Sequence, residues 1–352
     1  MSDEGRSSAD QGLTYRESGV DIDAQDRALA RIKHIAKSTF TAGVLSEIGS
    51  FGGLFSPDPE NPQGLVLVAS ADGVGTKLKV AQMMDRYDTV GQDLVNHCVN
   101  DILVQGARPL FFLDYFAAGK LVPERLTSVV EGLGKACREN ACALLGGETA
   151  EMPGLYQGED FDLAGFIVGS VRRDHLLPRN VSAGDALLGL PAAGLHTNGY
   201  SLARRLFFEQ KGFGAETRLD ELGTTVGEAL LAVHRSYLNP LACLVESGVG
   251  ITAMAHITGG GILDNLPRVL PEGVQAVVHD KAWEEPPIFR YIRREGRVPE
   301  EDMRRTFNLG VGMVLCVKAG AVDTIIEKLR DAGEKPFILG ELRPGPRGVA
   351  YV

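Results

Sequence analysis

Residues 64–77 read Gly-Leu-Val-Leu-Val-Ala-Ser-Ala-Asp-Gly-Val-Gly-Thr-Lys. The apolar, β-branched run predicts a strand from Gly64 to Ala71 that ends at Asp72. Glycines directly after a strand let backbone N–H groups approach an anion, and a carboxylate beside them can hold a hard cation. The stretch therefore indicates an α/β domain with a phosphate and cation site at the end of a strand.

Two further stretches combine apolar residues with glycine or a carboxylate: Val99-Asn100-Asp101 and Gly146-Gly147-Glu148-Thr149. Asp72, Asp101 and Glu148 are predicted to converge on Mg²⁺ bound to the phosphates of ATP. Taken singly, each stretch has a structural alternative, either a tight turn or a solvated helix face. The loop after Asp72 also lacks the spacing of a Walker A motif, which disfavours a Walker-type NTPase.

The rest of the first half alternates between strand and helix patterns. Leu94, Val95, Cys98, Val99, Ile102 and Leu103 recur at helical spacing, which leaves Asp93, His97, Asn100 and Asp101 on a separate polar stripe. Further expected elements are strands at 109–116, 141–145 and 161–171 and a helix at 126–137, with the 141–145 strand opening into Gly146-Gly147.

The second half restarts the pattern after a polar, proline-containing stretch at 172–184. Strands are expected at 186–190, 252–256, 275–279 and 311–317, and helices at 200–210, from 261 through 266, and at 322–331. We predict a tail at 1–14, an α/β domain at 15–174 that binds ATP and dimerises, and an α+β substrate-binding domain at 175–352.

Composition narrows the class of protein. The 352 residues suit two domains, and 44% hydrophobic with 23% charged residues is ordinary for a globular protein. The net charge of −10 and the absence of a basic cluster argue against nucleic-acid binding. Five scattered cysteines, no signal-peptide pattern and no long apolar run predict a reduced, cytoplasmic protein without a membrane contact.

Two loops of the second half have the character of binding loops. Gly194-Leu195-His196-Thr197-Asn198-Gly199 is too polar and glycine-rich for core packing, so His196 and Asn198 are predicted substrate contacts, with an exposed turn as the alternative. Thr258-Gly259-Gly260-Gly261 precedes a helical pattern, where free N–H groups could bind a substrate phosphate or simply form a strand-to-helix turn.

Together these segments resemble one enzyme family across nearly the whole chain. The matching runs include Tyr15–Lys33, Phe-Phe-Leu-Asp-Tyr-Phe at 111–116, Gly-Gly-Glu-Thr-Ala-Glu-Met-Pro-Gly at 146–154, His196–Leu202, His256–Pro271 and Arg305–Met313. They are similar to the phosphoribosylformylglycinamidine cyclo-ligases, also called aminoimidazole ribonucleotide synthetases. Superfamily relatives such as thiamine-monophosphate kinase, and a catalytically silent ATP-binding regulator, are weaker alternatives.

The resemblance implies an enzyme of purine biosynthesis. It would convert formylglycinamidine ribonucleotide and ATP into 5-aminoimidazole ribonucleotide, ADP and phosphate, with Mg²⁺ as cofactor. It also implies a homodimer whose N-terminal domains share a β-barrel, and a nucleotide covered by the glycine-containing segment 18–23.

Residue roles follow from the motifs and the resemblance. Mg²⁺ is assigned to Asp72, Asp101 and Glu148, with His196, Asn198 and Lys33 as catalytic groups and His196 as the acid/base. Nucleotide and phosphate contacts are assigned to Gly19, Asp21, Asp23, Lys33, Asp72, Gly73, Gly75, Thr76, Lys77, Asp93, Asn100, Asp101, Gly146, Gly147 and Glu148. Substrate contacts are assigned to His196, Asn198, Gly259, Gly260, Gly261, Thr306 and Asn308.

The chain departs from the family at a few positions. Leu195 and Thr197 stand where the family often has Pro and Ser, and Leu309 where it often has Cys. His97 stands where an apolar residue is common, so analogy gives it no chemical role. The other histidines outside the 194–199 loop show no ligand spacing.

Overall fold

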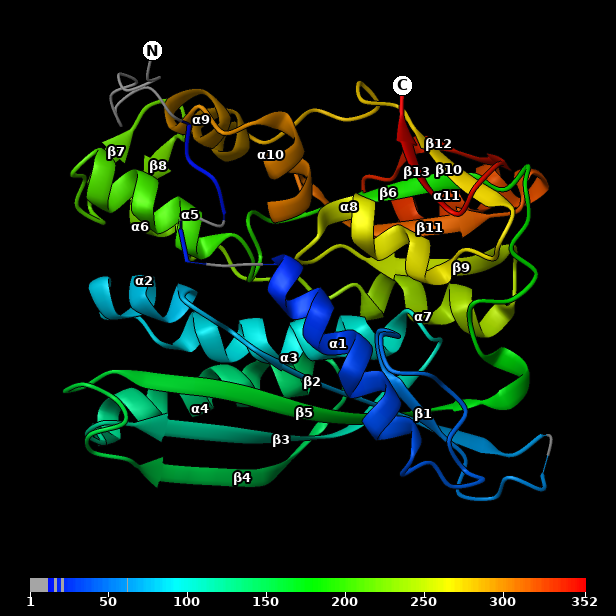
Figure 1. Ribbon diagram of the computed structural model, residues 1–352, viewed down its shortest axis with the longest axis horizontal. Helices are drawn as coiled ribbons and strands as arrows, with labels where there is room; N and C mark the ends of the chain where they lie inside the picture. The colour runs from blue at the N-terminus through cyan, green and yellow to red at the C-terminus, as the bar shows by residue number, and fades with distance from the viewer. Residues whose placement is uncertain (1–11, 16–17, 20–21, 62) are drawn as a thin grey trace, which may run out of the picture.

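The computed structural model describes residues 12–15, 18–19, 22–61 and 63–352. Two sheets, each with its own helices, divide these residues into two packed halves beside a long N-terminal helix (Figure 1). Within the described part of the chain, no helix combines the length and apolar character that a membrane span needs.

The first half is a five-stranded sheet in the order β1-β2-β5-β3-β4 with helices on one face. Its elements are α1 (Ile22–Lys37), β1 (Gly53–Phe55), β2 (Leu65–Gly73), α2 (Lys77–Met83), α3 (Asp88–Leu103), β3 (Arg108–Ala118), α4 (Pro123–Glu139), β4 (Ala143–Glu151), β5 (Phe161–Arg172) and the turn η1 (Arg173–His175). Only β3 and β4 pair in parallel; the other pairs are antiparallel.

The second half is built on a six-stranded sheet in the order β13-β10-β12-β6-β11-β9. Its elements are β6 (Ala186–Pro191), α5 (Tyr200–Arg204), η2 (Arg205–Gln210), β7 (Arg218–Leu219), β8 (Thr224–Thr225), α6 (Val226–Leu230), α7 (Leu238–Ser247), β9 (Ile251–His256), α8 (Gly261–Asn265), η3 (Leu266–Val269), β10 (Val274–Val278), α9 (Pro287–Gly296), α10 (Glu300–Thr306), β11 (Val311–Val317), η4 (Ala319–Ala321), α11 (Val322–Asp331), β12 (Phe337–Pro344) and β13 (Gly348–Tyr351). The expected strands and helices of both halves overlap these elements, with Gly64, residues 141–142 and His279 falling outside the strands, and the α/β plus α+β prediction is confirmed.

Helix α3 is the central element of the molecule. It packs on β2 and β5 of the first sheet and on α7 of the second half, and every residue from Thr89 to Leu103 is buried. Its apolar stripe enters the first core as expected. Its polar stripe does not face solvent, because the second half covers it.

The first sheet has an open face opposite α3. Along β5 buried residues alternate with exposed ones, and Phe166 on the uncovered side is 48% exposed. Leu65, Leu113 and Leu145 are also exposed, and by strand register Leu113 and Phe166 lie side by side. We call this surface, defined by Leu65, Leu113, Leu145 and Phe166, the open sheet face.

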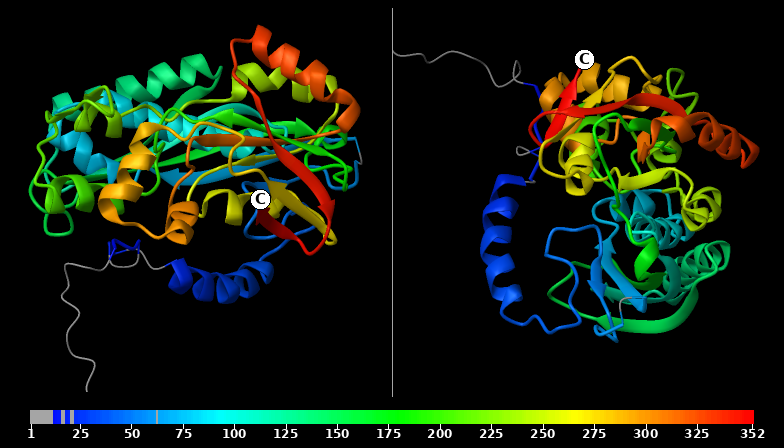
Figure 2. Two further views of the ribbon diagram at one scale, coloured as in Figure 1. Left: turned by 90° about the horizontal axis from the view of Figure 1, so that it is seen from above. Right: turned by 90° about the vertical axis from the view of Figure 1, so that its right-hand side faces the viewer.

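Helix α1 lies outside both cores. It runs beside the junction of the two halves (Figure 2), and its residues 31–35 are exposed. Its position brings Lys33 over the cavity described next.

Candidate active site

A cavity of about 710 Å³ lies between the two halves and under α1. Its lining comes from α1, β2, α3, α8 and η3, from the loop before α5 and the loop from β9 into α8, and from Tyr15, Gly49 and Phe51. Its lining residues are Tyr15, Lys33, Gly49, Phe51, Ser70, Ala71, Asp72, His97, Asp101, Asn198, Thr258, Gly259, Gly260, Leu263, Asp264, Pro267 and Arg268. Six predicted site residues meet here: Lys33, Asp72, Asp101, Asn198, Gly259 and Gly260.

Asp72 and Asp101 lie close together in the lining of this cavity. Asp72 ends β2, Asp101 lies on α3, and the His97 Nε2 atom is 2.8 Å from Asp72 Oδ2 and 3.8 Å from Asp101 Oδ2. His256 at the end of β9 holds Asp101 Oδ1 through Nδ1 at 2.8 Å. The prediction that Asp72 and Asp101 converge therefore agrees with the geometry, and two histidines hold them in place.

The charges of this cluster are strongly coupled. Burial acts to raise the pKa of Asp72, but the His97 imidazole and the Gly73 N–H hold it below its usual value. Burial acts to lower the pKa of His97, and the neighbouring Asp72 and Asp101 nevertheless raise it to about 9. Burial keeps the pKa of His256 below its usual value despite its bond to Asp101.

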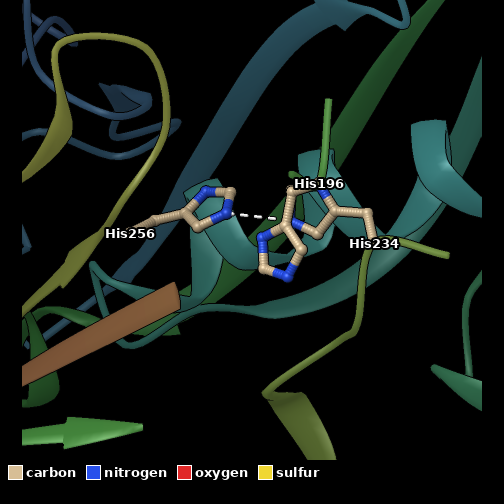
Figure 3. A group of neighbouring side chains, drawn as sticks. All are labelled: His196, His234 and His256. Carbon is tan, nitrogen blue, oxygen red and sulfur yellow. Dashed lines mark hydrogen bonds between the residues drawn. The ribbon is translucent and has the colours of Figure 1, made fainter. Parts of the chain in front are cut away.

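The cluster continues into the second half through Thr197 and His234. The Thr197 hydroxyl lies 2.8 Å from His97 Nδ1 and 3.4 Å from His234 Nδ1. His234 Nε2 lies 3.0 Å from His256 Nε2, the contact drawn in Figure 3. The His196 ring stacks on His234 with centroids 4.0 Å apart.

Lys77 does not contact the cavity, which corrects its assignment to phosphate. Its ammonium is fully buried and bonds to Asp93 Oδ2 at 2.7 Å and to the carbonyl oxygens of His196 and Ala232. These acceptors use all three of its donors. Burial lowers the pKa of Lys77 and raises that of Asp93, and their ion pair opposes both shifts. Lys77 and Asp93 thus join the two halves of the molecule.

Asn100 likewise joins the halves rather than supporting a cation. Its amide nitrogen donates to the Arg235 carbonyl at 2.9 Å, and its oxygen accepts the Tyr237 N–H at 2.9 Å. Asn96 on the same helix also joins the halves, since it donates to the His234 carbonyl at 2.8 Å.

Glu148 does not meet Asp72 and Asp101 within this chain, so the predicted three-carboxylate site is wrong in that part. Asp72 is in register with Gly165, Gly165 with Asp114, and Asp114 with Gly147, so three strand spacings separate β2 from β4. That is about 14 Å at roughly 4.8 Å per strand. Glu148 follows Gly147, and successive side chains point to opposite faces, so it lies on the open sheet face.

Gly146 and Gly147 are also part of β4, not a loop after a strand. Gly146 has φ 140° and is exposed. A Cβ on Gly147 would lie 2.1 Å from the Asp114 carbonyl oxygen. Close pairing of β3 with β4 therefore explains the second glycine, and neither lines the cavity.

The loop after Asp72 contributes less than expected. The Gly73 N–H donates to Asp72 Oδ1 at 2.7 Å, so it is already bonded. Gly75 has φ +63° and makes the turn into α2, and Thr76 lies within 3.4 Å of Ser201. Gly73, Gly75 and Thr76 do not line the cavity.

The N-terminal segment is described only in part. Gly19 is exposed with φ +95° and is outside the cavity lining. Asp21 lies outside the described residues, as does the side chain of Asp23.

His196 is fully buried behind the cavity wall, which Asn198 lines instead. Its Nε2 accepts the Ala193 N–H at 3.1 Å, and burial together with the nearby His256 and Lys77 holds its pKa well below the usual value. The His196 imidazole is therefore not placed to exchange protons with a molecule in the cavity, contrary to its assignment as acid/base.

The three glycines after β9 differ in their surroundings. Gly259 and Gly260 line the cavity, whereas Gly261 packs against the Arg304 carbonyl. The Gly260 N–H donates to Arg305 O at 2.8 Å and the Gly261 N–H to Thr258 O at 3.0 Å. Because these two N–H groups are bonded inside the fold, they are not the free phosphate donors that we expected.

Thr306 and Asn308 also lie away from the cavity. Both are buried, and Asn308 donates to the Gly194 carbonyl at 2.9 Å while accepting the Gly310 N–H. These contacts shape the 194–199 loop, so substrate contact is not their role in this geometry.

Sequence reasoning missed His97, His256 and Arg268 as members of the site. His97 lies one helical turn before Asp101 on the predicted polar stripe, and that i, i+4 spacing was a usable signal. His256 ends a predicted strand directly before the glycine loop. Arg268 had no local signal, since only the fold brings it to the cavity that Asp72 also lines.

Two carboxylates of the cavity, Asp72 and Asp101, are ligands that suit Mg²⁺. Mg²⁺ is commonly held by one or two carboxylates together with substrate phosphates, and Asp72 and Asp101 supply two in a cavity that also holds Lys33 and Arg268. His97 and His256 bond the outer sides of these carboxylates, as outer partners of a metal ligand do.

Comparison with known proteins identifies the family to which each half of this fold is similar. A family model described as "AIR synthase related protein, N-terminal domain" matches residues 53–171, and its C-terminal counterpart matches residues 182–352. The two-sheet fold with an acidic site at the junction thus defines a protein of the AIR synthase related class.

Relatives narrow the class further. The phosphoribosylformylglycinamidine cyclo-ligase of Alkaliphilus metalliredigens (strain QYMF) is 48% identical, over 96% of this chain and 97% of the relative. That of Desulfitobacterium hafniense (strain DSM 10664 / DCB-2) is 50% identical, over 97% and 100%. The chain belongs to the phosphoribosylformylglycinamidine cyclo-ligase family.

Solved structures share the fold at low sequence identity. Thiamine-monophosphate kinase from Stenotrophomonas maltophilia K279a has a TM-score of 0.61 at 18% identity, covering 90% of this chain and 93% of its own. The hydrogenase maturation protein HypE in complex with ATP has a TM-score of 0.58 at 18% identity, covering 81% of each chain.

Proposed function

We propose that this chain is an ATP-dependent cyclo-ligase. It converts formylglycinamidine ribonucleotide and ATP into 5-aminoimidazole ribonucleotide, ADP and phosphate in purine biosynthesis. The observation that carries the proposal is the meeting of Asp72 and Asp101 in one interdomain cavity, in a chain about half identical to enzymes with that name.

The reaction needs an activated oxygen. An amide oxygen is a poor leaving group, so the formyl oxygen of the substrate first takes the γ-phosphoryl group of ATP, which releases ADP. The substrate nitrogen then attacks the formyl carbon, the ring closes and phosphate leaves with that oxygen. This sequence balances without any further reactant.

The chain supplies binding and charge for these steps. When bound, Mg²⁺ supplies positive charge to the phosphate oxygens, and Asp72 and Asp101 would hold it. Lys33 and Arg268 in the lining offset the remaining phosphate charge, beside a His97 imidazole whose pKa is raised to about 9. Asn198 offers an amide at the same wall to orient the substrate.

We also propose that the active enzyme is a homodimer in the cytoplasm. The open sheet face supports the dimer, because Phe166 and Leu145 leave 48% and 64% of their surface in water on a face that a second copy would cover. The five free cysteines, four of them buried, suit a reducing compartment.

One assay tests the activity. Purified protein is mixed with formylglycinamidine ribonucleotide, Mg²⁺ and ATP, and phosphate and the aminoimidazole product are measured together. We expect equal amounts of both. Phosphate without the cyclised product would instead identify a kinase or an ATPase, and neither product would reject the proposal.

A further inference from the structure

A continuous chain of contacts links the two acidic residues through the second half of the molecule. It runs from Asp72 to His97, Thr197, His234 and His256 and ends at Asp101, with contact distances of 2.8, 2.8, 3.4, 3.0 and 2.8 Å in that order. We call these six residues the histidine relay. It leaves the first half at His97 and returns to it at Asp101.

The middle members of the relay cannot touch a substrate. His234 is fully buried, Thr197 is 9% exposed, and neither lines the cavity. Their contacts reach the cavity through His97, His256 and Asn198, whose amide donates to the Thr197 hydroxyl at 3.5 Å.

His234 is held so firmly that it can serve as an anchor. Its N–H donates to Asp93 at 2.7 Å, its carbonyl accepts from Asn96 at 2.8 Å, and both residues lie on α3. Its ring stacks on His196 with an interplanar angle of 19° (Figure 3). Both ring nitrogens have partners: Nδ1 contacts Thr197, and Nε2 contacts His256 and, at 3.2 Å, the Asn100 amide nitrogen.

The other two histidines of the relay, His97 and His256, also have a partner at both ring nitrogens. His97 bonds Thr197 with Nδ1 and Asp72 with Nε2, and His256 bonds His234 with Nε2 and Asp101 with Nδ1. Because the His97 and His256 rings are each bonded at both nitrogens, their orientations are fixed. His97 in turn holds Asp72, and His256 holds Asp101.

We propose that Thr197 and His234 are positioning residues for the carboxylates of the active site. Through His97 and His256 they set the orientations of Asp72 and Asp101 and couple the 194–199 loop to them. The inference deepens the proposed function, since it concerns the site assigned there to Mg²⁺ and ATP.

The Thr197 hydroxyl is the member to remove, because valine has nearly the same shape and no hydroxyl. Its loss leaves buried nitrogens of His97 and His234 without a partner, and both rings are then free to reorient. Loss of an outer partner of a metal ligand typically costs about 10–100-fold in metal affinity or activity.

The experiment compares Thr197→Val with two controls. Thr197→Ser keeps the hydroxyl, and Thr89→Val makes the same change at a buried α3 hydroxyl that has no hydrogen-bond partner among the described residues. For each, kcat, the KM for ATP and the apparent Mg²⁺ affinity are measured. Proton–nitrogen spectra of histidine-labelled protein without substrate, with each histidine assigned by substitution, report the rings directly.

We expect Thr197→Val to lower kcat or Mg²⁺ affinity about 10-fold and to shift the ring signals of both His97 and His256. Thr197→Ser and Thr89→Val should stay near wild type in all measurements. Thr197→Ala, with the same readouts, replaces the valine variant if that protein does not fold.

Three results would overturn the inference: a fully active valine variant, an equal loss in the serine variant, or unmoved His256 signals. The spectra need no turnover, so they decide the coupling even if the wild-type protein makes no aminoimidazole product. That outcome would reject the proposed function and leave the relay standing.

Discussion

Helix α3 and strand β4 belong to the same half of the molecule, but their surroundings are opposite. The polar stripe of α3, with Asp93, His97 and Asp101, is fully buried, whereas β4 exposes nearly all its residues, Leu145 among them. Polar groups are thus inside and apolar groups outside at these two surfaces.

Both surfaces depart from the usual arrangement of polar side chains outside and apolar side chains inside, and each has a physical reason. Buried polar groups need partners, and those of α3 find them in the second half of the same chain, where the active-site cavity forms. Exposed apolar groups gain by being covered, and the described chain has nothing that covers the open sheet face. Helix α3 is thus covered within one chain, whereas β4 stays uncovered among the described residues.

The largest effect should follow from breaking the α3 surface. Asp93→Ala leaves the buried Lys77 ammonium without its counterion and should lower the free energy of unfolding by about 3–5 kcal/mol. Denaturant unfolding measures this. Asp174→Ala, which breaks the exposed pair with Arg172 at 2.7 Å, should cost far less, because water and salt screen exposed ion pairs. Equal costs would mean that the buried pair does not join the halves.

The next effect concerns activity. Asp101→Asn keeps the shape of the side chain but removes its charge, so kcat should fall by about 10²–10³-fold with the fold intact. Steady-state kinetics and a melting curve check both parts. Asp160→Asn, at the exposed pair with Lys79, is the control and should remain active. Near-normal turnover of Asp101→Asn would remove this residue from the cation site.

A third prediction breaks the other surface. Phe166→Lys should weaken the proposed dimer about 10-fold or more, since burying such a side chain is worth about 1.5–3 kcal/mol. Sedimentation across a concentration series measures this. Ile338→Lys changes an equally exposed residue of β12, at 55%, and should leave the assembly unchanged. If both variants behave alike, the open sheet face is not the interface.

The smallest effect is expected at Glu148, which tests whether a carboxylate of β4 contributes as Asp101 of α3 does. Glu148 lies on the open sheet face, so Glu148→Gln should change kcat by only about 2-fold, equivalent to about 0.5 kcal/mol. Its Mg²⁺ titration is to be compared with that of Asp101→Asn. A loss as large as that of Asp101→Asn would mean that Glu148 reaches a cation in the assembled enzyme.

Much of the fold could be predicted from local pattern. The apolar, β-branched run at 64–71 and the helical spacing at 94–103 each predicted an element of the right type. Strands β12 and β13, at 337–351, were not predicted, and β12 nevertheless lies between β10 and β6. Its burial follows no clean alternation and its register shifts between Ile338 and Gly340, so the period-two signal is absent.

The candidate site was predictable only in part. Asp72 and Asp101 were found because each stands where an apolar pattern ends or turns polar. Glu148 was placed with them because Gly146-Gly147 resembled the end of a strand, whereas strand pairing continues to Glu151. Lys77 was taken as a phosphate contact because it follows a glycine loop, although the fold turns its side chain toward Asp93.

By itself, the sequence determined the family, the alternating elements of both halves and two of the acidic residues, because periodicity and motifs are properties of neighbouring residues. Only the tertiary structure decided that His97, His234 and His256 meet and that Glu148 does not join Asp101. Such contacts join segments far apart along the chain, and their geometry depends on how the two sheets pack around α3.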